Sequence, residues 1–282
     1  MMTTLAAQAQ MTEIEQTPRC AIEQWQKKEI NGTALMRRLI AWKHWNIAIF
    51  ESAAVEMLAT NAASCIMYGR DPKGVGRLFL YSDNAAYAIF CRQSEADDYQ
   101  HFLTASGGWI FRLSLEGISE IVIDPFSPTE IVYGEEHFAW LWEMADAMEV
   151  EEALTKLRFQ PESADDVIPL VRDYASYVLA VNRVRGGTVL AMAPDARGRQ
   201  LAAVFTSMEA FDAFYPEGKQ GCPDGELLIL NMSGIELFSH LAKMNLEGMV
   251  FNCSGPARPI AFAAGIAQVI LDSVPQSEQT AV

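Results

Sequence analysis

The best candidates for catalytic nucleophiles in this chain lie in a short loop near the C-terminus. Cys253 and Ser254 follow an apolar run, and a thiol or hydroxyl placed in such a loop can attack an acyl group. The chain has no Gly-x-Ser-x-Gly motif that would expose a catalytic serine. An inert, buried cysteine is the simpler interpretation. We therefore predict no catalytic residue and keep a hydrolase that uses Cys253 as an alternative.

The histidines, cysteines and glycines do not form motifs for a metal or a phosphate group. No two of the four histidines have His-x-x-x-His spacing, and the five cysteines form no Cys-x-x-Cys pair. Gly74-Val75-Gly76 and Gly186-Gly187 do not continue as phosphate-binding loops. We predict neither a metal nor a cofactor. The odd number of cysteines argues against a disulfide framework and favours a reducing cytoplasm.

Acidic residues dominate one part of the chain and limit the classes of partner. The net charge is −15, and residues 91–166 carry 17 acidic and four basic residues, or −13. Nucleic acids and anionic membranes would be repelled by this segment, so we predict neither as a partner. Within it, Glu143, Asp146 and Glu149 have the spacing of one helix face beside Trp140. A solvated helix face is one interpretation, and a surface that binds a protein partner is the other.

The chain shows no signal for export or membrane insertion. No apolar stretch approaches the roughly 20 residues needed to cross a bilayer. Residues 1–17 lack a basic segment followed by an apolar block, so we expect no secretory signal peptide. We predict a cytoplasmic protein with short tails at residues 1–19 and 276–282.

Hydrophobic periodicity and turn residues predict a similar order of elements in the two halves of the chain. In the first half we expect strands at 44–50, 64–68, 77–81, 109–115 and 121–123, with helices at 83–91 and 135–157. After a polar linker at 161–169, we expect strands at 177–181, 188–192, 202–206, 227–230 and 249–252, with helices at 208–215 and 261–271.

A segment of the first half is repeated in the second. Residues 78–90 and 203–215 both read as an apolar run, a serine and an aromatic-rich helix, 125 positions apart. We predict an α+β fold of two similar mixed-sheet units with covering helices, in tandem, at residues 20–160 and 161–275. Residues that both copies share should serve folding, whereas a reactive site would occur once.

The six tryptophans all lie in the first half of the chain. On a helix, Trp140 and Trp142 would point about 200° apart. Both are buried only if that helix is covered on two sides. We therefore expect it to dock against the second half or against another subunit, which leaves a homo-oligomer possible.

The second half carries motifs that resemble the N-terminal domain of the SseB-like family. Residues 204–211, 232–238 and 250–252 match its strand-Thr-Ser-helix, Ser-Gly-x-Glu-Leu and final strand patterns. Cys253 stands where the family usually has proline, and the first half keeps that proline at Pro125 but has Asp124 in place of asparagine. The resemblance implies a bacterial cytoplasmic protein, and it brings no catalytic residues with it.

These observations favour a non-enzymatic protein-interaction or regulatory module whose partner surface includes Trp140, Glu143, Asp146 and Glu149. The alternative is a protein that binds a small molecule resembling an amino acid in a crevice near the Asn252 or Asp124 turn. Candidate ligand-binding residues for that alternative are Asp124, Glu236, Asn252, Cys253 and Ser254.

Overall fold

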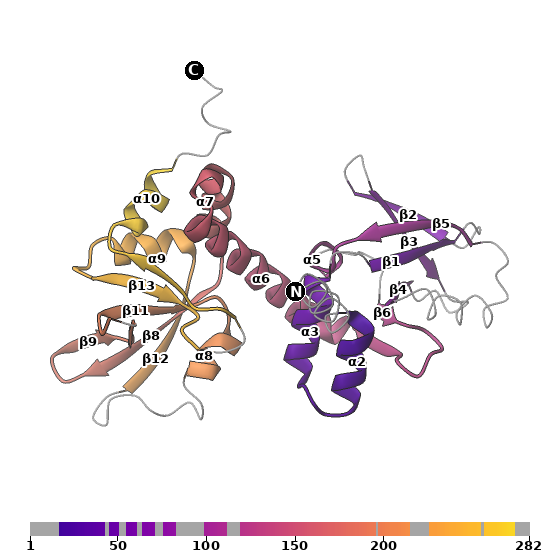
Figure 1. Ribbon diagram of the computed structural model, residues 1–282, viewed down its shortest axis with the longest axis horizontal. Coiled ribbons are helices and arrows are strands. Elements are labelled where there is room, and N and C mark those ends of the chain that lie inside the picture. Colours follow the sequence, from indigo (N-terminus) through magenta and orange to yellow (C-terminus); the bar gives the residue numbers. More distant parts are fainter. Residues whose placement is uncertain are drawn as a thin grey trace, which may run out of the picture. The chain divides into compact units, whose positions relative to one another are not determined.

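The computed structural model describes residues 17–42, 45–50, 55–60, 64–70, 76–82, 99–111, 119–195, 197–214, 226–254 and 257–273. The chain divides into two compact units, Met1–Ala145 and Asp146–Val282. Each unit combines helices with a mixed sheet, which confirms the predicted α+β class (Figure 1). The boundary between the units lies inside a helix, whereas the sequence places it at residue 160.

The first unit contains seven described strands and several short helices. Its elements are α2 (Pro18–Gln26), α3 (Gly32–Ala41), β1 (Trp45–Phe50), β2 (Val55–Thr60), β3 (Ser64–Arg70), β4 (Gly76–Tyr81), β5 (Tyr99–Ala105), α5 (Gly107–Ile110), β6 (Glu120–Ile123), β7 (Ile131–Gly134) and η1 (Glu135–His137). The next helix, α6 (Phe138–Phe159), crosses the boundary between the units.

The second unit also contains seven described strands. Its elements after α6 are η2 (Pro161–Ser163), α7 (Ala164–Asp173), β8 (Tyr177–Val184), β9 (Gly187–Leu190), β10 (Met192–Pro194), β11 (Gln200–Phe205), α8 (Met208–Phe214), β12 (Glu226–Met232), α9 (Gly234–Leu241), β13 (Gly248–Phe251), β14 (Ile260–Ala263) and α10 (Ile266–Asp272).

Five strands have the same order and directions in each unit. They run β5-β1-β4-β6-β7 in the first sheet and β12-β8-β11-β13-β14 in the second. In each sheet the third and fourth of these strands are parallel (β4 with β6, β11 with β13), and the other neighbours are antiparallel. This agreement favours the predicted tandem repeat, whose origin in a duplication stays a prediction.

The strand register corrects the sequence alignment of the two halves by one residue. Leu80 pairs with Ile123 on β6, and Val204 pairs with Phe251 on β13. Ser82 is therefore the counterpart of Thr206, 124 positions away, and not of Ser207. Ser207 instead caps α8, because its hydroxyl accepts a hydrogen bond from the Ala210 N–H at 3.2 Å.

Three predicted elements differ from the structure, and four of the described strands were not predicted. The strand predicted at 109–115 does not begin at residue 109, because Gly107–Ile110 form α5, and the strand that pairs with β1 is β5. The predicted linker at 161–169 is wrong, because α7 begins at Ala164 and continues through Pro169. The predicted helix at 261–271 is β14 followed by α10. The strands that were not predicted are β2, β5, β7 and β14. The predicted helix at 83–91 lies outside the described residues.

Tertiary packing explains why α7 forms despite its proline. Val167, Ile168 and Val171 are buried in the core of the second unit, and this apolar face outweighs the hydrogen bond that Pro169 cannot donate. Local sequence shows the proline but not the surface that the helix covers.

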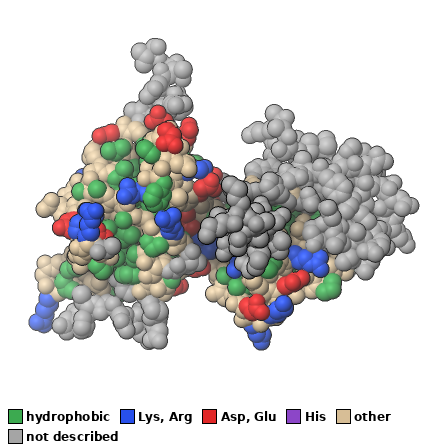
Figure 2. All heavy atoms as spheres, viewed as in Figure 1, with side chains coloured by type: hydrophobic (Ala, Val, Ile, Leu, Met, Phe, Trp, Pro, Cys, Tyr) green, Lys and Arg blue, Asp and Glu red, His purple; other side chains and the backbone are tan. Residues whose placement is uncertain are grey.

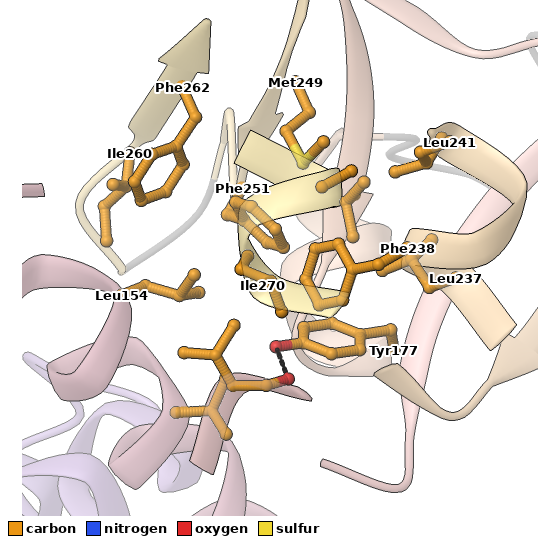
Figure 3. Packing of buried hydrophobic residues seen from close by; sticks show 14 of the residues in the cluster. Leu154, Tyr177, Leu237, Phe238, Leu241, Met249, Phe251, Ile260, Phe262 and Ile270 are labelled. Atoms are coloured by element: carbon orange, nitrogen blue, oxygen red, sulfur yellow. Dashed lines mark hydrogen bonds between the residues drawn. The ribbon is translucent and has the colours of Figure 1, made fainter. Parts of the chain in front are cut away.

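The larger core of the second unit lies between one face of its sheet and helices α6, α7, α9 and α10 (Figures 1 and 3). The Phe251 ring on β13 is fully buried and packs with the rings of Tyr177, Phe238 and Phe262 at centroid distances of 5.8, 6.4 and 6.0 Å. The Tyr177 hydroxyl donates to the Val171 carbonyl at 2.9 Å, so its polar end is satisfied inside the core. A smaller core on the other face packs α8 through Phe211.

Helix α6 buries a different stripe in each of its two parts. Leu141, Met144 and Ala145 are buried in the part that belongs to the first unit. Val150 and Leu154 are buried in the core of the second unit. By helical geometry the two stripes do not lie in line, so a single amphipathic face could not be read from the sequence.

Candidate functional site

The turn after β6 is held by a buried carboxylate. Asp124 is fully buried and has a positive φ of 51°. Its Oδ1 accepts from the Ser82 N–H and its Oδ2 from the Ser82 hydroxyl, both at 2.6 Å. Oδ2 also accepts from the Thr129 hydroxyl at 3.0 Å. The backbone N–H of Asp124 donates to the Leu80 carbonyl at 2.8 Å. These bonds join the end of β6 to the end of β4.

The turn after β13 has the same arrangement with an amide in place of the carboxylate. Asn252 is 1% exposed and has a positive φ of 49°. Its Oδ1 accepts from the Thr206 N–H at 3.0 Å, and its backbone N–H donates to the Val204 carbonyl at 2.9 Å. Its Nδ2 donates to the Thr206 hydroxyl at 2.9 Å and to the Glu151 carboxylate at 3.1 Å. The Thr206 hydroxyl in turn donates to Glu151 at 2.7 Å.

The hydrogen bonds of Asp124 and Asn252 therefore fix each turn to the neighbouring parallel strand. Asparagine and aspartate tolerate the left-handed backbone better than other non-glycine residues, which suits both types to this position. Their side chains satisfy backbone N–H groups that would otherwise be unpaired. Folding alone explains both hydrogen-bond networks, and a ligand at these turns stays a prediction.

Glu151 belongs to this network, and the sequence did not identify it as a functional or structural residue. It lies on α6, 101 positions from Asn252. The only available signal was that Glu151 is one more acid in an acidic helix, which does not separate it from its solvated neighbours.

The candidate nucleophile Cys253 is half-buried, as is Ser254. Burial raises the pKa of the Cys253 thiol to about 11, because the charged thiolate is less well solvated there. Only the thiolate is a good nucleophile. At neutral pH this environment therefore opposes the chemistry that a cysteine hydrolase requires, although the hydrolase alternative itself remains to be tested.

Cys253 is expected to react slowly with iodoacetamide at pH 7. A pKa of about 11 in place of 9.0 leaves about 100-fold less thiolate than an ordinary thiol has. Peptide mass spectrometry of the folded chain should show labelling that accelerates as the pH rises from 7 toward 10. Labelling in denaturant supplies the unperturbed rate. Rapid labelling of the folded chain at pH 7 would contradict this prediction and favour the hydrolase alternative.

Glu236 takes part in a local helix cap. It lies in the first turn of α9, and its carboxylate accepts from the Ser233 N–H at 3.0 Å and from the Ser233 hydroxyl at 2.8 Å. These hydrogen bonds lower the pKa of Glu236 below its usual range. The Ser233 hydroxyl accepts from the Glu236 N–H, which completes a capping box. The cap accounts for Glu236 without a ligand.

The predicted partner residues lie on the surface of α6. Glu143 and Asp146 are exposed, and Glu149 is half-buried. Trp140 and Trp142 are 36% and 38% exposed, so neither tryptophan is fully covered. We call this surface the acidic face of α6, made of Trp140, Trp142, Glu143, Asp146 and Glu149. Within the described ranges, no group of three or more His, Cys, Asp or Glu side chains could hold a metal ion. The same ranges contain no helix with the length and hydrophobicity that spanning a bilayer requires.

An open groove of about 660 Å³ lies within the second unit, and the sequence did not predict it. It is lined by the end of α6, by β14 and by the start of α10. Arg158 and Arg199 are the charged side chains among its described lining residues. No local pattern marks this groove, because it forms where β14 and α10 meet the end of α6, about 100 positions earlier in the sequence.

Comparisons with known proteins assign no family to the chain. No family model and no curated protein matches it. Among solved structures it is similar to Anabaena Tic22 (protein transport), with 11% identity, covering 77% of this chain and 88% of that one, at a TM-score of 0.19. A TM-score this low does not show a shared fold.

Proposed function

We propose that this chain is a non-enzymatic cytoplasmic module of the SseB-like type that binds a basic protein partner. The observation that carries the proposal is the acidic face of α6, where exposed carboxylates lie on the same helix as two partly exposed tryptophans. Exposed aromatic side chains are common anchors of protein interfaces, and they are unusual on a surface that serves only solubility.

Helical geometry favours one shared face of α6 for most of these residues. Trp142, Asp146 and Glu149 follow at i, i+4 and i+7, and Glu143 lies beside them. Trp140 borders Glu143 one turn away on the other side. A partner that brings lysine or arginine to Asp146 and Glu149 could therefore also contact Trp142.

The charge distribution supports a basic partner over an acidic one. The chain has a net charge of −15, and the acidic face of α6 would repel an acidic protein that approached it. A basic protein would be attracted toward the acidic segment, which raises its association rate at low ionic strength. The same reasoning leads us to propose that nucleic acids and anionic membranes are not partners.

Charge reversal tests the acidic face. We expect Glu143→Lys/Asp146→Lys to lose the proteins that co-purify with the wild-type chain from its host cells. The control Asp212→Lys/Glu226→Lys makes the same change in net charge on α8 and β12, where the side chains are also exposed. Quantitative mass spectrometry should recover the same partners with the control as with the wild type. Equal recovery with both variants would contradict the proposed face.

A further inference from the structure

The edge strand β14 presents backbone groups that β13 does not use. β14 is the last strand in the described order of its sheet and pairs only with β13 there. The Ala264 N–H donates to the Glu247 carbonyl at 3.2 Å, which marks residues 264 and 247 as a hydrogen-bonded pair. Hydrogen-bonded and non-hydrogen-bonded pairs alternate along antiparallel strands. The N–H and C=O groups of Ala261 and Ala263 therefore point away from β13.

These outward groups lie at the groove of the second unit. Ala261 and Ala263 both line it, together with apolar residues such as Leu157, Ile266 and Val269. An unpaired strand edge is a template for another strand. Its side chains here are alanines, which leave room for a neighbouring backbone to approach. A volume of about 660 Å³ is enough to hold several side chains of an added segment.

Arg158 of the groove and Arg258 nearby give this region a positive charge on an otherwise acidic protein. The guanidinium groups of Arg158 and Arg258 lie 5.8 and 5.0 Å from the centre of the Phe159 ring, which is 54% exposed. Within the described part of the chain neither makes an ion pair. Arg199, by contrast, is bound to Asp195 at 2.7 Å. Figure 2 shows basic side chains interspersed with hydrophobic ones on one face of this unit.

We infer that β14 binds an extended, acidic segment of a partner protein by strand addition. The segment pairs its backbone with Ala261 and Ala263, and its carboxylates bind Arg158 and Arg258. Main-chain hydrogen bonds supply affinity in this mode of recognition, and side-chain contacts supply specificity. The inference does not depend on the acidic face of α6, which has the opposite charge and would bind a different partner.

A synthetic peptide supplies the probe. We would titrate the full chain against a fluorescent, end-blocked eight-residue peptide that alternates glutamate and valine. We expect saturable binding below about 1 mM. A peptide with lysine in place of glutamate should bind at least about tenfold more weakly, as should the glutamate peptide N-methylated at alternate residues, which cannot pair with the strand. Absence of saturable binding, or equal binding of the lysine peptide, would overturn the inference.

Variants separate strand pairing from simple charge attraction. Ala263→Pro removes an outward N–H that β13 does not use and should weaken binding about tenfold, whereas Ala263→Ser keeps that N–H and should bind as the wild type does. Arg158→Gln/Arg258→Gln should also weaken binding, unlike the control Arg183→Gln/Arg185→Gln on the β8–β9 hairpin. Loss with the arginine variant but full binding by Ala263→Pro would rule out strand addition.

Hydrogen exchange provides a readout that does not require any variant to fold. The bound peptide should slow exchange of the Ala261 and Ala263 amides and leave the Phe262 amide, which already pairs with β13, unchanged. Glu143→Lys/Asp146→Lys should bind the peptide normally, so a failure of the proposed acidic face and a failure of this groove give different results. Unchanged exchange at Ala261 and Ala263 with peptide bound would place the peptide elsewhere.

Discussion

Replacing Gly234 with alanine is expected to destabilise the second unit by about 3 kcal/mol, through overpacking against backbone atoms. A Cβ atom there would lie 2.2 Å from the Arg172 carbonyl oxygen and 2.7 Å from that of Val171. These acceptors belong to the end of α7 and cannot move aside as a side-chain tip can. The Gly234 N–H also donates to the Tyr174 carbonyl at 2.7 Å, which fixes the close approach.

The first unit offers an independent copy of the same contact. Gly107 donates to the Trp42 carbonyl at 2.7 Å, and its Cβ would lie 2.2 Å from the Leu39 carbonyl oxygen. Gly107→Ala should therefore be similarly costly. Gly108→Ala and Gly187→Ala are matched controls, because a Cβ at either position meets no atom within 4 Å. We expect these controls to change stability by less than about 0.5 kcal/mol.

Native-state hydrogen exchange measures the stability of each unit separately, which a single melting curve of a two-unit chain would not do. Amides of β8 and β11 report on the second unit, and amides of β1 and β4 report on the first. If Gly234→Ala leaves exchange on β8 and β11 unchanged, the close contact between residue 234 and the end of α7 does not restrict this position to glycine.

The second large effect is expected from Asn252→Asp, which should destabilise the second unit by about 3 kcal/mol at pH 7. The Asn252 Nδ2 donates to the Glu151 carboxylate at 3.1 Å, so aspartate would place two carboxylates in contact at a buried site. It would also leave Glu151 and the Thr206 hydroxyl without that donor. Asp124 in the first unit is tolerated because Ser82 and Thr129 donate to it.

The pH dependence of this variant distinguishes charge repulsion from a general packing defect. The repulsion between the two carboxyl groups is relieved when they share a proton. The folded state of the variant therefore holds that proton more tightly than the unfolded state does. Its pKa in the folded state is therefore raised, and stability relative to the wild type should recover as the pH falls toward the ordinary carboxyl range.

Glu151→Gln/Asn252→Asp is the matched rescue. A glutamine amide at position 151 can donate to the new aspartate, so the double variant should regain most of the lost stability at pH 7. Hydrogen exchange on β11 and β13 from pH 5 to 8 measures both effects. A loss that is independent of pH and is not rescued would show that the two side chains do not interact as described.

Local sequence determined where most of the strands lie along the chain. Alternating or continuous apolar runs predicted β1, β3, β4 and β6 in the first unit, and β8, β11, β12 and β13 in the second. The repeat in the sequence also predicted that the two units would follow a similar plan. These signals suffice because a strand buried on one or both faces must show a short-range hydrophobic pattern.

Tertiary structure decided the features that depend on distant residues. The pairing of Leu80 with Ile123 and of Val204 with Phe251 set the register, since hydrogen bonds across the sheet define which residues are equivalent. The last strand, β14, was read as helix because the alternation of its buried Ile260 and Phe262 with alanines spans only four residues.

The sequence by itself therefore determined the α+β class, the positions of the main strands along the chain and the strongly acidic segment. The identification of Glu151 as a partner of Asn252, and of β14 as one wall of an arginine-bearing groove, required the structure. The physical reason is that these sites join residues about 100 positions apart. Short-range periodicity reports which face of an element is apolar, and it carries no information about which element that face will meet.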